Sequence, residues 1–150
     1  MDLKEVISRL EKYCSFSEKC KKDIFRKLYE WKIYNNHEKI INSLTENNYL
    51  NEERYALHYC KGKFNSRRWG KIKITNHLKN KGLDMITINK GLNEISNTSY
   101  VDALSDIIVK KSALLKEDNV YQKKSKIARY ALQKGYESNL VWQQIDILVK

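Results

Sequence analysis

Proline is absent from the 150-residue chain, and only five glycines are present. Proline interrupts helices and sheets, and glycine inside a helix costs roughly 0.5 to 1 kcal/mol relative to alanine. Apolar residues nevertheless make up 41% of the chain, which is enough to bury a core. A chain that lacks these helix breakers and is rich in lysine, leucine and glutamate is predicted to be all-α.

Motifs of catalysis and metal binding are also missing. The sequence has no glycine-rich phosphate loop, no G-x-S-x-G turn and no H-E-x-x-H zinc motif. Glu52 and Glu53 are adjacent and cannot face each other on a helix. Cys60 and His58 are two residues apart and also point in different directions. We therefore expect a protein that is not an enzyme and that uses neither a cofactor nor a metal.

No long apolar run is present either. No stretch approaches the roughly 18 apolar residues that a membrane helix needs. The N-terminal residues MDLKEVISRL are amphipathic, unlike the apolar segment of a secretory signal. Cys14, Cys20 and Cys60 include no C-x-x-C pair, which is typical of buried thiols in a reducing cytosol. The expected location is the cytoplasm, with no membrane partner.

Apolar residues at helical spacing predict nine helices. The first runs from about Leu3 to Cys14, and a capping box at Ser15 to Glu18, with Ser17 as the rival cap, is expected to start the second. The later helices are expected to begin near Asn36, Asn51, Arg68, Asp84, Ser99, Val120 and Ser138. Gly82 and Gly135 are predicted to end two of them. Inward-facing positions include Ile41, Leu44, Val141, Ile145 and Leu148.

These helices repeat in threes. Lys81-Gly82-Leu83 matches Lys134-Gly135-Tyr136, and the apolar residues that flank both segments match at the same offset of 53 residues. We predict three tandem three-helix repeats, at residues 1–48, 49–97 and 98–150. Because each unit of a stacked repeat contacts only its neighbours, the expected molecule is elongated and curved.

The net charge of +11 is concentrated in the middle of the chain. From Arg54 to Leu83 there are nine basic residues and no acidic residue, with Phe64 and Trp69 between them. Lysine and arginine neutralise phosphates, and exposed aromatic rings stack on bases, whereas Tyr55 and Tyr59 are expected in the core. The predicted binding residues are Lys61, Lys63, Arg67, Arg68, Trp69, Lys71, Lys73, Lys79 and Lys81. The alternatives are a solvated basic face or a generally lysine-rich composition.

A second basic cluster follows in the last third of the chain. It also contains Glu117 and Asp118, so its electrostatic potential is expected to be weaker. A phosphate-binding surface and a plain solvated face are equally compatible with this pattern. The cluster consists of Lys110, Lys111, Lys123, Lys124, Lys126 and Arg129.

Three stretches of the sequence match motifs of one known protein family. Residues 48–56, NYLNEERYA, resemble the family signature G-Y-L-[DN]-[DE]-x-R-[FY]-A. Ser66-Arg67-Arg68-Trp69-Gly70, followed by Lys81-Gly82-Leu83, resembles the family's next run, and Lys134-Gly135-Tyr136 is similar to its closing R-G-[FY]. The departures are Asn48 in place of glycine, where asparagine tolerates the left-handed conformation, and a first repeat without glycine at Trp31-Lys32-Ile33.

These stretches resemble the RecX regulators of the bacterial recombinase RecA. The resemblance implies three three-helix repeats and modulation of RecA, usually inhibition. It implies binding to the RecA–single-stranded-DNA filament, with limits on strand exchange, ATP hydrolysis and co-protease activity. The implied partners are the RecA nucleoprotein filament and single-stranded DNA, with double-stranded DNA left open, and a monomer is expected. The alternatives are a stand-alone DNA-binding protein with helix-turn-helix-like units and a scaffold that binds only protein.

Overall fold

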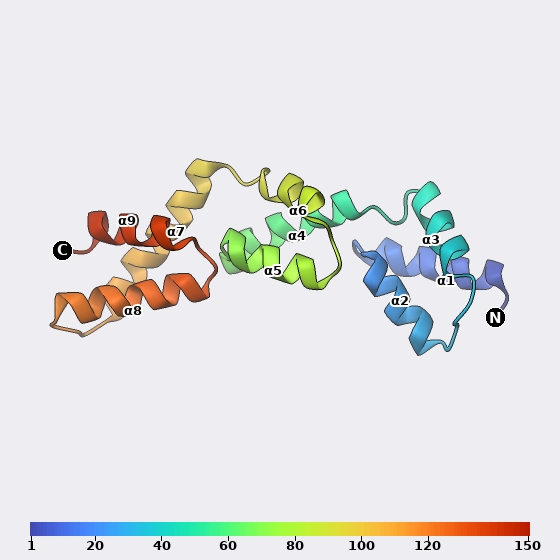
Figure 1. Cartoon of the computed structure of the whole chain (residues 1–150), viewed down its shortest axis with the longest axis horizontal. Helices are drawn as coiled ribbons and strands as arrows, with labels where there is room; N and C mark the ends of the chain where they lie inside the picture. Colours follow the sequence, from blue (N-terminus) through green and yellow to red (C-terminus); the bar gives the residue numbers. More distant parts are fainter. The chain divides into compact units, whose positions relative to one another are not determined.

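The computed structural model describes all 150 residues and is entirely helical (Figure 1). It has nine helices and no strand, which confirms the all-α prediction. The helices are α1 (Leu3–Phe16), α2 (Lys21–Glu30), α3 (His37–Glu46), α4 (Glu52–Arg67), α5 (Lys71–Asn80), α6 (Met85–Leu92), α7 (Asn97–Leu114), α8 (Val120–Gln133) and α9 (Ser138–Leu148). None of them is long and apolar enough to cross a membrane.

Side-chain caps fix several helix starts. Asn51 and Asp84 accept hydrogen bonds from the backbone N–H groups three residues on, as predicted. The predicted start of α2 is wrong, because α1 continues through Ser15 to Phe16 and the N-cap of α2 is Cys20. There the Asp23 carboxylate accepts from the Cys20 N–H at 3.0 Å, which completes a capping box.

Two other predicted helix starts are wrong. The cap of α7 is Ser96, whose hydroxyl oxygen accepts from the Ser99 N–H, so Ser99 lies inside the helix. Helix α9 begins at Ser138 as predicted, with Glu137 as its N-cap. Helix α5 begins at Lys71 and not at Arg68, because Arg68 has a positive φ of 56° that no right-handed helix accommodates.

Left-handed residues end several helices. Gly82 and Gly135 have φ values of 86° and 100°, and after each one the next N–H bonds back to a carbonyl five residues earlier. Lys32 occupies the same place after α2, with φ of 58° and a bond from the Ile33 N–H to the Leu28 carbonyl. Asn48 also has a positive φ, so both turns that lack the family glycine form here.

Replacing Lys32 with glycine is expected to stabilise the fold. A side chain in the left-handed region costs about 1 to 2 kcal/mol, and the greater freedom of glycine in the unfolded chain offsets part of the gain. Lys32→Gly should therefore raise the free energy of unfolding by about 0.5 to 1 kcal/mol. Chemical denaturation measures this change. Lys32→Ala keeps the strained backbone, and an equal gain in that variant would contradict the explanation.

The first three helices enclose an apolar core. Its buried residues are Val6, Leu10, Cys14, Ile24, Leu28, Ile40, Leu44 and Leu50. The prediction of Ile41 as an inward residue is wrong in part, because Ile40 is fully buried and Ile41 only borders the core. Helices α7, α8 and α9 pack against one another in the same way (Figure 1). There Val141 and Ile145 are buried as predicted, but Val149 takes the inner place expected for Leu148.

The chain divides into two compact units. The first unit comprises residues 1–59 and 78–91, and the second comprises residues 60–77 and 92–150. Helices α4 and α5 each contribute to both units. The repeat borders at residues 48 and 97 therefore stay a prediction.

Candidate nucleic-acid interface

The loop between α4 and α5 carries the densest part of the predicted basic site. Helix α4 ends at Arg67, and the left-handed Arg68 turns the chain away from the helix axis. The Arg68 N–H bonds to the Phe64 carbonyl at 3.0 Å, and the Trp69 N–H bonds to the Lys63 carbonyl at 3.3 Å. As a result both arginine side chains are exposed to solvent.

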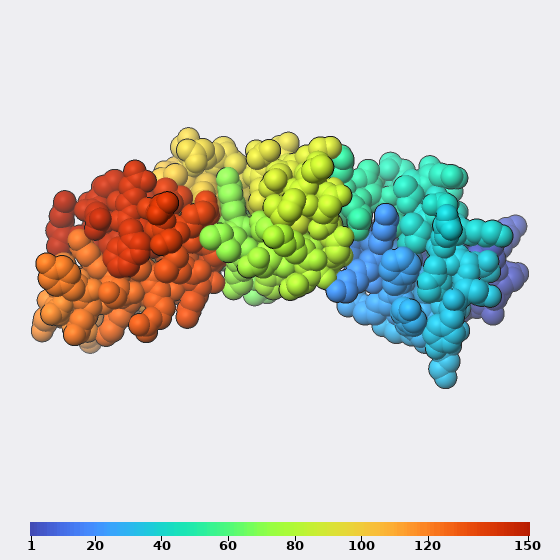
Figure 2. All heavy atoms as spheres, in the orientation of Figure 1, coloured from blue at the N-terminus to red at the C-terminus, as the bar shows by residue number.

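This loop is fastened to the turn between α8 and α9. The Gly70 N–H donates to the Lys134 carbonyl at 2.7 Å, and the Ile72 N–H donates to the Gly135 carbonyl at 3.0 Å. The Lys134 ammonium donates to the Arg67 carbonyl at 2.8 Å. In the space-filling view, atoms of the two segments touch directly (Figure 2). We call this contact the glycine joint, since Gly70 and Gly135 meet backbone to backbone and neither has room for a Cβ atom.

Three aromatic rings lie beneath the glycine joint. Tyr100 lies between Phe64 and Tyr136, with ring-centroid distances of 6.0 and 4.9 Å. Burial raises the pKa of Tyr136 to about 12, and burial followed by the hydrogen bond to Glu137 raises the pKa of Tyr100. Both phenols therefore keep their protons at neutral pH. Tyr136 donates to the Arg68 carbonyl at 2.9 Å, while Tyr100 donates to Glu137 and accepts from the Lys71 N–H.

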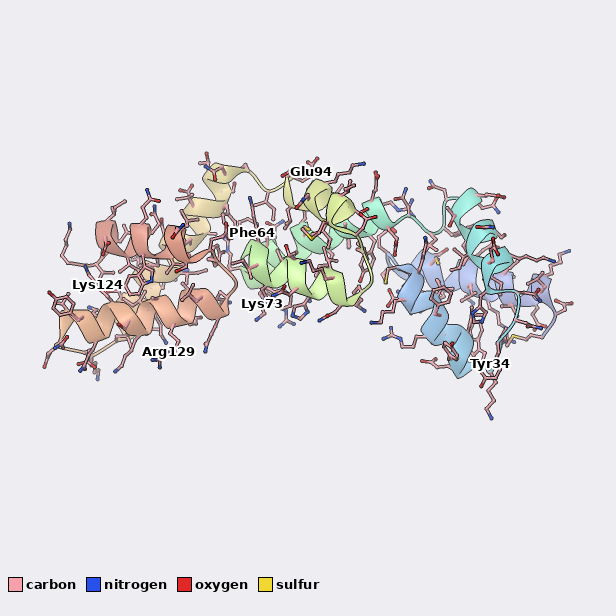
Figure 3. All side chains as sticks on the ribbon, viewed as in Figure 1. Tyr34, Phe64, Lys73, Glu94, Lys124 and Arg129 are labelled. Carbon is pink, nitrogen blue, oxygen red and sulfur yellow. The ribbon has the colours of Figure 1, made fainter.

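Basic side chains cover the outer side of the loop. The ammonium groups of Lys63 and Lys73 lie 5.0 and 4.7 Å from the ring centroid of Trp69, and Figure 3 marks Phe64 and Lys73 on their helices. Trp69 is half-buried and also contacts His77, with ring centroids 4.5 Å apart. A base could therefore reach this indole face only by displacing a lysine.

The charges of this surface are uncompensated. The chain has nine ion pairs, and none of them includes Arg67, Arg68, Lys71 or Lys73. An open hollow of about 610 Å³ lies beside the two arginines. Its lining residues are Ser66, Arg67, Arg68, Trp69 and Lys134. We call Arg67, Arg68, Trp69, Lys71, Lys73 and Lys134 together the joint surface.

Lys134 is a candidate binding residue that the sequence analysis does not name. It lies 67 positions after Arg67 in the sequence, and the hydrogen bonds of the glycine joint bring the two residues together. Its place in the Lys134-Gly135-Tyr136 motif was the available signal.

The other predicted site residues are distributed differently. Lys61 is exposed on α4 in the second unit, whereas Lys79 and Lys81 belong to the first unit. Lys81 forms an ion pair with the buried Asp23 at 3.3 Å, so part of its charge is neutralised within the fold. The expected core position of Tyr55 is confirmed, and Tyr59 is half-buried.

Arg54 was counted in the basic stretch, and the structure gives it an internal role. Its guanidinium pairs with Glu18 and donates to the Asn48 carbonyl at 3.0 Å and the Tyr49 carbonyl at 3.4 Å. It therefore links the segment after α1 to the turn after α3 within the first unit.

Half of the second basic cluster is neutralised by ion pairs. Lys110 pairs with Asp106, Lys124 with Asp146 and Lys126 with Glu117, at 2.9, 3.3 and 2.8 Å. Lys111 lies 4.6 Å from the ring centroid of Tyr130. Lys123 and Arg129 have no acidic partner, and Figure 3 shows Lys124 and Arg129 on α8. This surface is consequently less positive than the joint surface.

Comparison with known proteins identifies two segments of the chain. The family model for the second three-helix domain of RecX matches residues 51–92, and the model for the third three-helix domain matches residues 98–145. The regulatory protein RecX of Clostridium acetobutylicum is 30% identical over 149 residues, which cover 95% of this chain and 66% of that protein. RecX of Bacillus thuringiensis is 26% identical over 102 residues, covering 68% of this chain and 38% of that protein. The chain thus spans less than two thirds of the length of these relatives.

Solved structures agree in fold. The crystal structure of RecX from Lactobacillus salivarius superposes with a TM-score of 0.85 at 24% identity, covering 97% of this chain and 98% of that one. Another crystal structure of regulatory protein RecX gives a TM-score of 0.86 at 21% identity, covering 95% of this chain and 72% of that one. Together with the sequence matches, these findings show that the chain belongs to the RecX family of regulatory proteins.

Proposed function

We propose that this chain binds the RecA–single-stranded-DNA filament and inhibits strand exchange, ATP hydrolysis and co-protease activity. The proposal starts from membership of a family named for regulation and adds the chemistry of the joint surface. A non-enzymatic regulator of this kind acts by occupying a surface of its target. It needs no catalytic residue, cofactor or metal of its own.

The observation that carries the proposal is the uncompensated charge of the joint surface. Arg67, Arg68, Lys71 and Lys73 have no acidic partner within the chain, and Lys134 lies beside them. Like charges gathered on one surface repel each other, and a bound polyanion relieves this repulsion. The phosphates of DNA within the filament supply such a polyanion, and so does an acidic patch on the recombinase.

The remaining features of the proposal follow from the same function. Residues 1–48, 49–97 and 98–150 are proposed as the three repeats, supported by the family matches at 51–92 and 98–145. The second basic cluster is proposed as a weaker contact, mainly through Lys123 and Arg129. We also propose that the protein acts as a monomer in the cytoplasm, where recombinase filaments form.

The test is an assay of the cognate recombinase. The chain, at one copy per recombinase protomer, is added to filaments on single-stranded DNA, and strand exchange and ATP hydrolysis are followed. Both rates are expected to fall. Unchanged rates at this ratio would contradict the proposal, and faster rates would identify an activator in place of an inhibitor.

A stand-alone DNA-binding protein is the second candidate function. The joint surface favours it because cations without acidic partners attract DNA phosphates even when no recombinase is present. Gel-shift assays without recombinase separate the two candidates. Tight and sequence-specific binding to duplex DNA would favour the alternative, whereas binding that requires the filament would favour the regulator.

A further inference from the structure

An exposed pair of tyrosines lies at the turn between α2 and α3. Tyr29 is 60% exposed and Tyr34 is 67% exposed, and their ring centroids are 5.8 Å apart. Figure 3 marks Tyr34 at this turn. Two such rings side by side offer an apolar surface to a partner, since each could bury well over a hundred square ångströms. The pair belongs to the first unit, whereas the residues of the joint surface belong to the second.

The rings are supported from the protein side. Tyr29 meets His37 edge-on, with ring centroids 6.1 Å apart, and His37 also contacts Phe25 at 5.7 Å. A hydrogen bond of 2.9 Å between His37 Nε2 and the Ile33 carbonyl holds the imidazole in place. The tyrosine pair therefore rests on an ordered base and presents its remaining surface to solvent.

A lysine occupies a strained position between the two tyrosines in the sequence. Lys32 has a φ of 58° in the turn where Gly82 and Gly135 stand after α5 and α8. Glycine adopts this backbone without strain, so lysine here lowers stability. Backbone strain of this kind is found preferentially at functional sites. Lys32 is exposed and has no ion pair, which leaves its ammonium available to an anion.

The surroundings of the pair are positively charged. Residues 19–39 contain seven basic and three acidic side chains. Two of the three acids are already engaged, since Asp23 is buried and bonded to Cys20, Arg26 and Lys81, and Glu30 pairs with Lys27. The potential outside this turn is consequently favourable for a polyanion.

We infer that Tyr29, Tyr34 and Lys32 form a second nucleic-acid contact, which takes single-stranded DNA or RNA. The two ring planes are inclined by 48°, so one base stacks on one ring of the pair and meets the other at its edge, and the adjoining phosphate lies against Lys32. Stacking needs an open base face, which a duplex hides and a single strand offers, so single strands are preferred. The contact requires no recombinase, so a test of it is independent of the function proposed above.

The experiment follows a fluorescein-labelled oligo(dT) by anisotropy, using the full chain without recombinase. Tyr29→Ala/Tyr34→Ala is expected to weaken binding about tenfold, the loss expected for one stacked base. Tyr29→Phe/Tyr34→Phe keeps the rings and should bind like the wild type. The matched control is Tyr121→Ala, which removes a tyrosine that is 84% exposed near the start of α8 and should change nothing.

Lys32→Gly separates a binding role from a structural one. It is expected to raise the Tm by about 2 °C and at the same time to weaken oligo(dT) binding about threefold. A lysine with no ligand would give the higher Tm with unchanged affinity, which would exclude Lys32 from the contact.

Photocrosslinking of the wild-type chain to a bromodeoxyuridine-substituted oligonucleotide locates the bound strand without any substitution in the protein. Mass spectrometry is expected to find the crosslink at Tyr29 or Tyr34. The inference is overturned when oligo(dT) does not bind at low salt, when no crosslink maps to this turn, or when the double alanine variant binds DNA normally. Loss of recombinase binding alone in that variant would make the turn a protein contact and would likewise overturn it.

Discussion

Gly135→Ala is expected to lower the free energy of unfolding by about 3 to 5 kcal/mol. Gly135 has a φ of 100°, where any side chain is strained, and an added Cβ would lie only 2.7 Å from the Lys73 backbone nitrogen and still closer to the Lys73 Cβ. The neighbouring backbone cannot retreat without breaking the bonds from the Ile72 N–H to Gly135 and from the Gly70 N–H to Lys134. The strain of the left-handed backbone and the steric overlap with Lys73 therefore both lower the stability of the variant.

Gly82→Ala is the matched control for this prediction. Gly82 also follows a helix and a lysine, with φ of 86°, but nothing lies within 4 Å of an added Cβ. Gly82→Ala should lower the free energy of unfolding by about 1 kcal/mol, which is the cost of the left-handed backbone alone. Urea denaturation of both variants measures the difference. Equal losses would mean that the glycine joint contributes nothing beyond an ordinary helix stop.

The segments that carry the family resemblance turn out to connect parts of the fold. Arg54 of the stretch NYLNEERYA binds Glu18 and the carbonyls of the turn after α3. Gly70 and Gly135 belong to the other two signature segments and meet in the glycine joint. The motifs could be recognised in the sequence because each is short and local. The contacts between the motifs could not be predicted, because these contacts join residues that are dozens of positions apart.

The helices themselves were largely predictable, since apolar spacing depends on neighbours within a few residues. The residues at which the helices begin were less predictable. The segment from Ser15 to Glu18 has the residues of a capping box, but α1 buries Cys14 and continues past Ser15. Cys20 has no obvious capping side chain, and the carboxylate of Asp23 closes that turn. Burial alone would raise the pKa of Asp23, but the hydrogen bonds from Cys20 and the charge of Lys81 outweigh it and lower that pKa.

The concentration of positive charge was predictable from the sequence, but the set of cations without an acidic partner was not. An acid-free stretch of sequence reveals excess charge, and five of the six joint-surface residues come from that stretch. Sequence does not reveal which cations are neutralised by distant acids. Arg54 and Lys81 pair with Glu18 and Asp23, which precede them by 36 and 58 positions.

Charge reversal at the joint surface is expected to weaken binding to oligo(dT) and to the recombinase filament about 100-fold or more at about 50 mM salt. The variant carries Glu at Arg67, Arg68, Lys71 and Lys73. Each phosphate contact on a single strand contributes about 0.7 to the salt slope, so losing up to four lowers it by up to about 3. Arg67 and Arg68 are exposed, whereas Lys71 and Lys73 are half-buried over the rings of Tyr100 and Trp69, at 4.8 and 4.7 Å from the ring centroids. Circular dichroism and thermal unfolding therefore check the fold of the variant, and Arg67→Glu/Arg68→Glu, which leaves both ring contacts in place, should show about half of the fall in salt slope.

A matched control distinguishes a site from overall charge. Lys4, Lys12, Lys116 and Lys150 are exposed, have no ion pair and belong neither to a predicted basic cluster nor to the surroundings of the tyrosine pair. Reversing them changes the net charge of +11 by the same amount. Long-range attraction alone predicts equal losses in the two variants, whereas a localised site predicts a small loss and an unchanged salt slope in the control. If the two variants lose affinity equally, the joint surface is not where the polyanion binds.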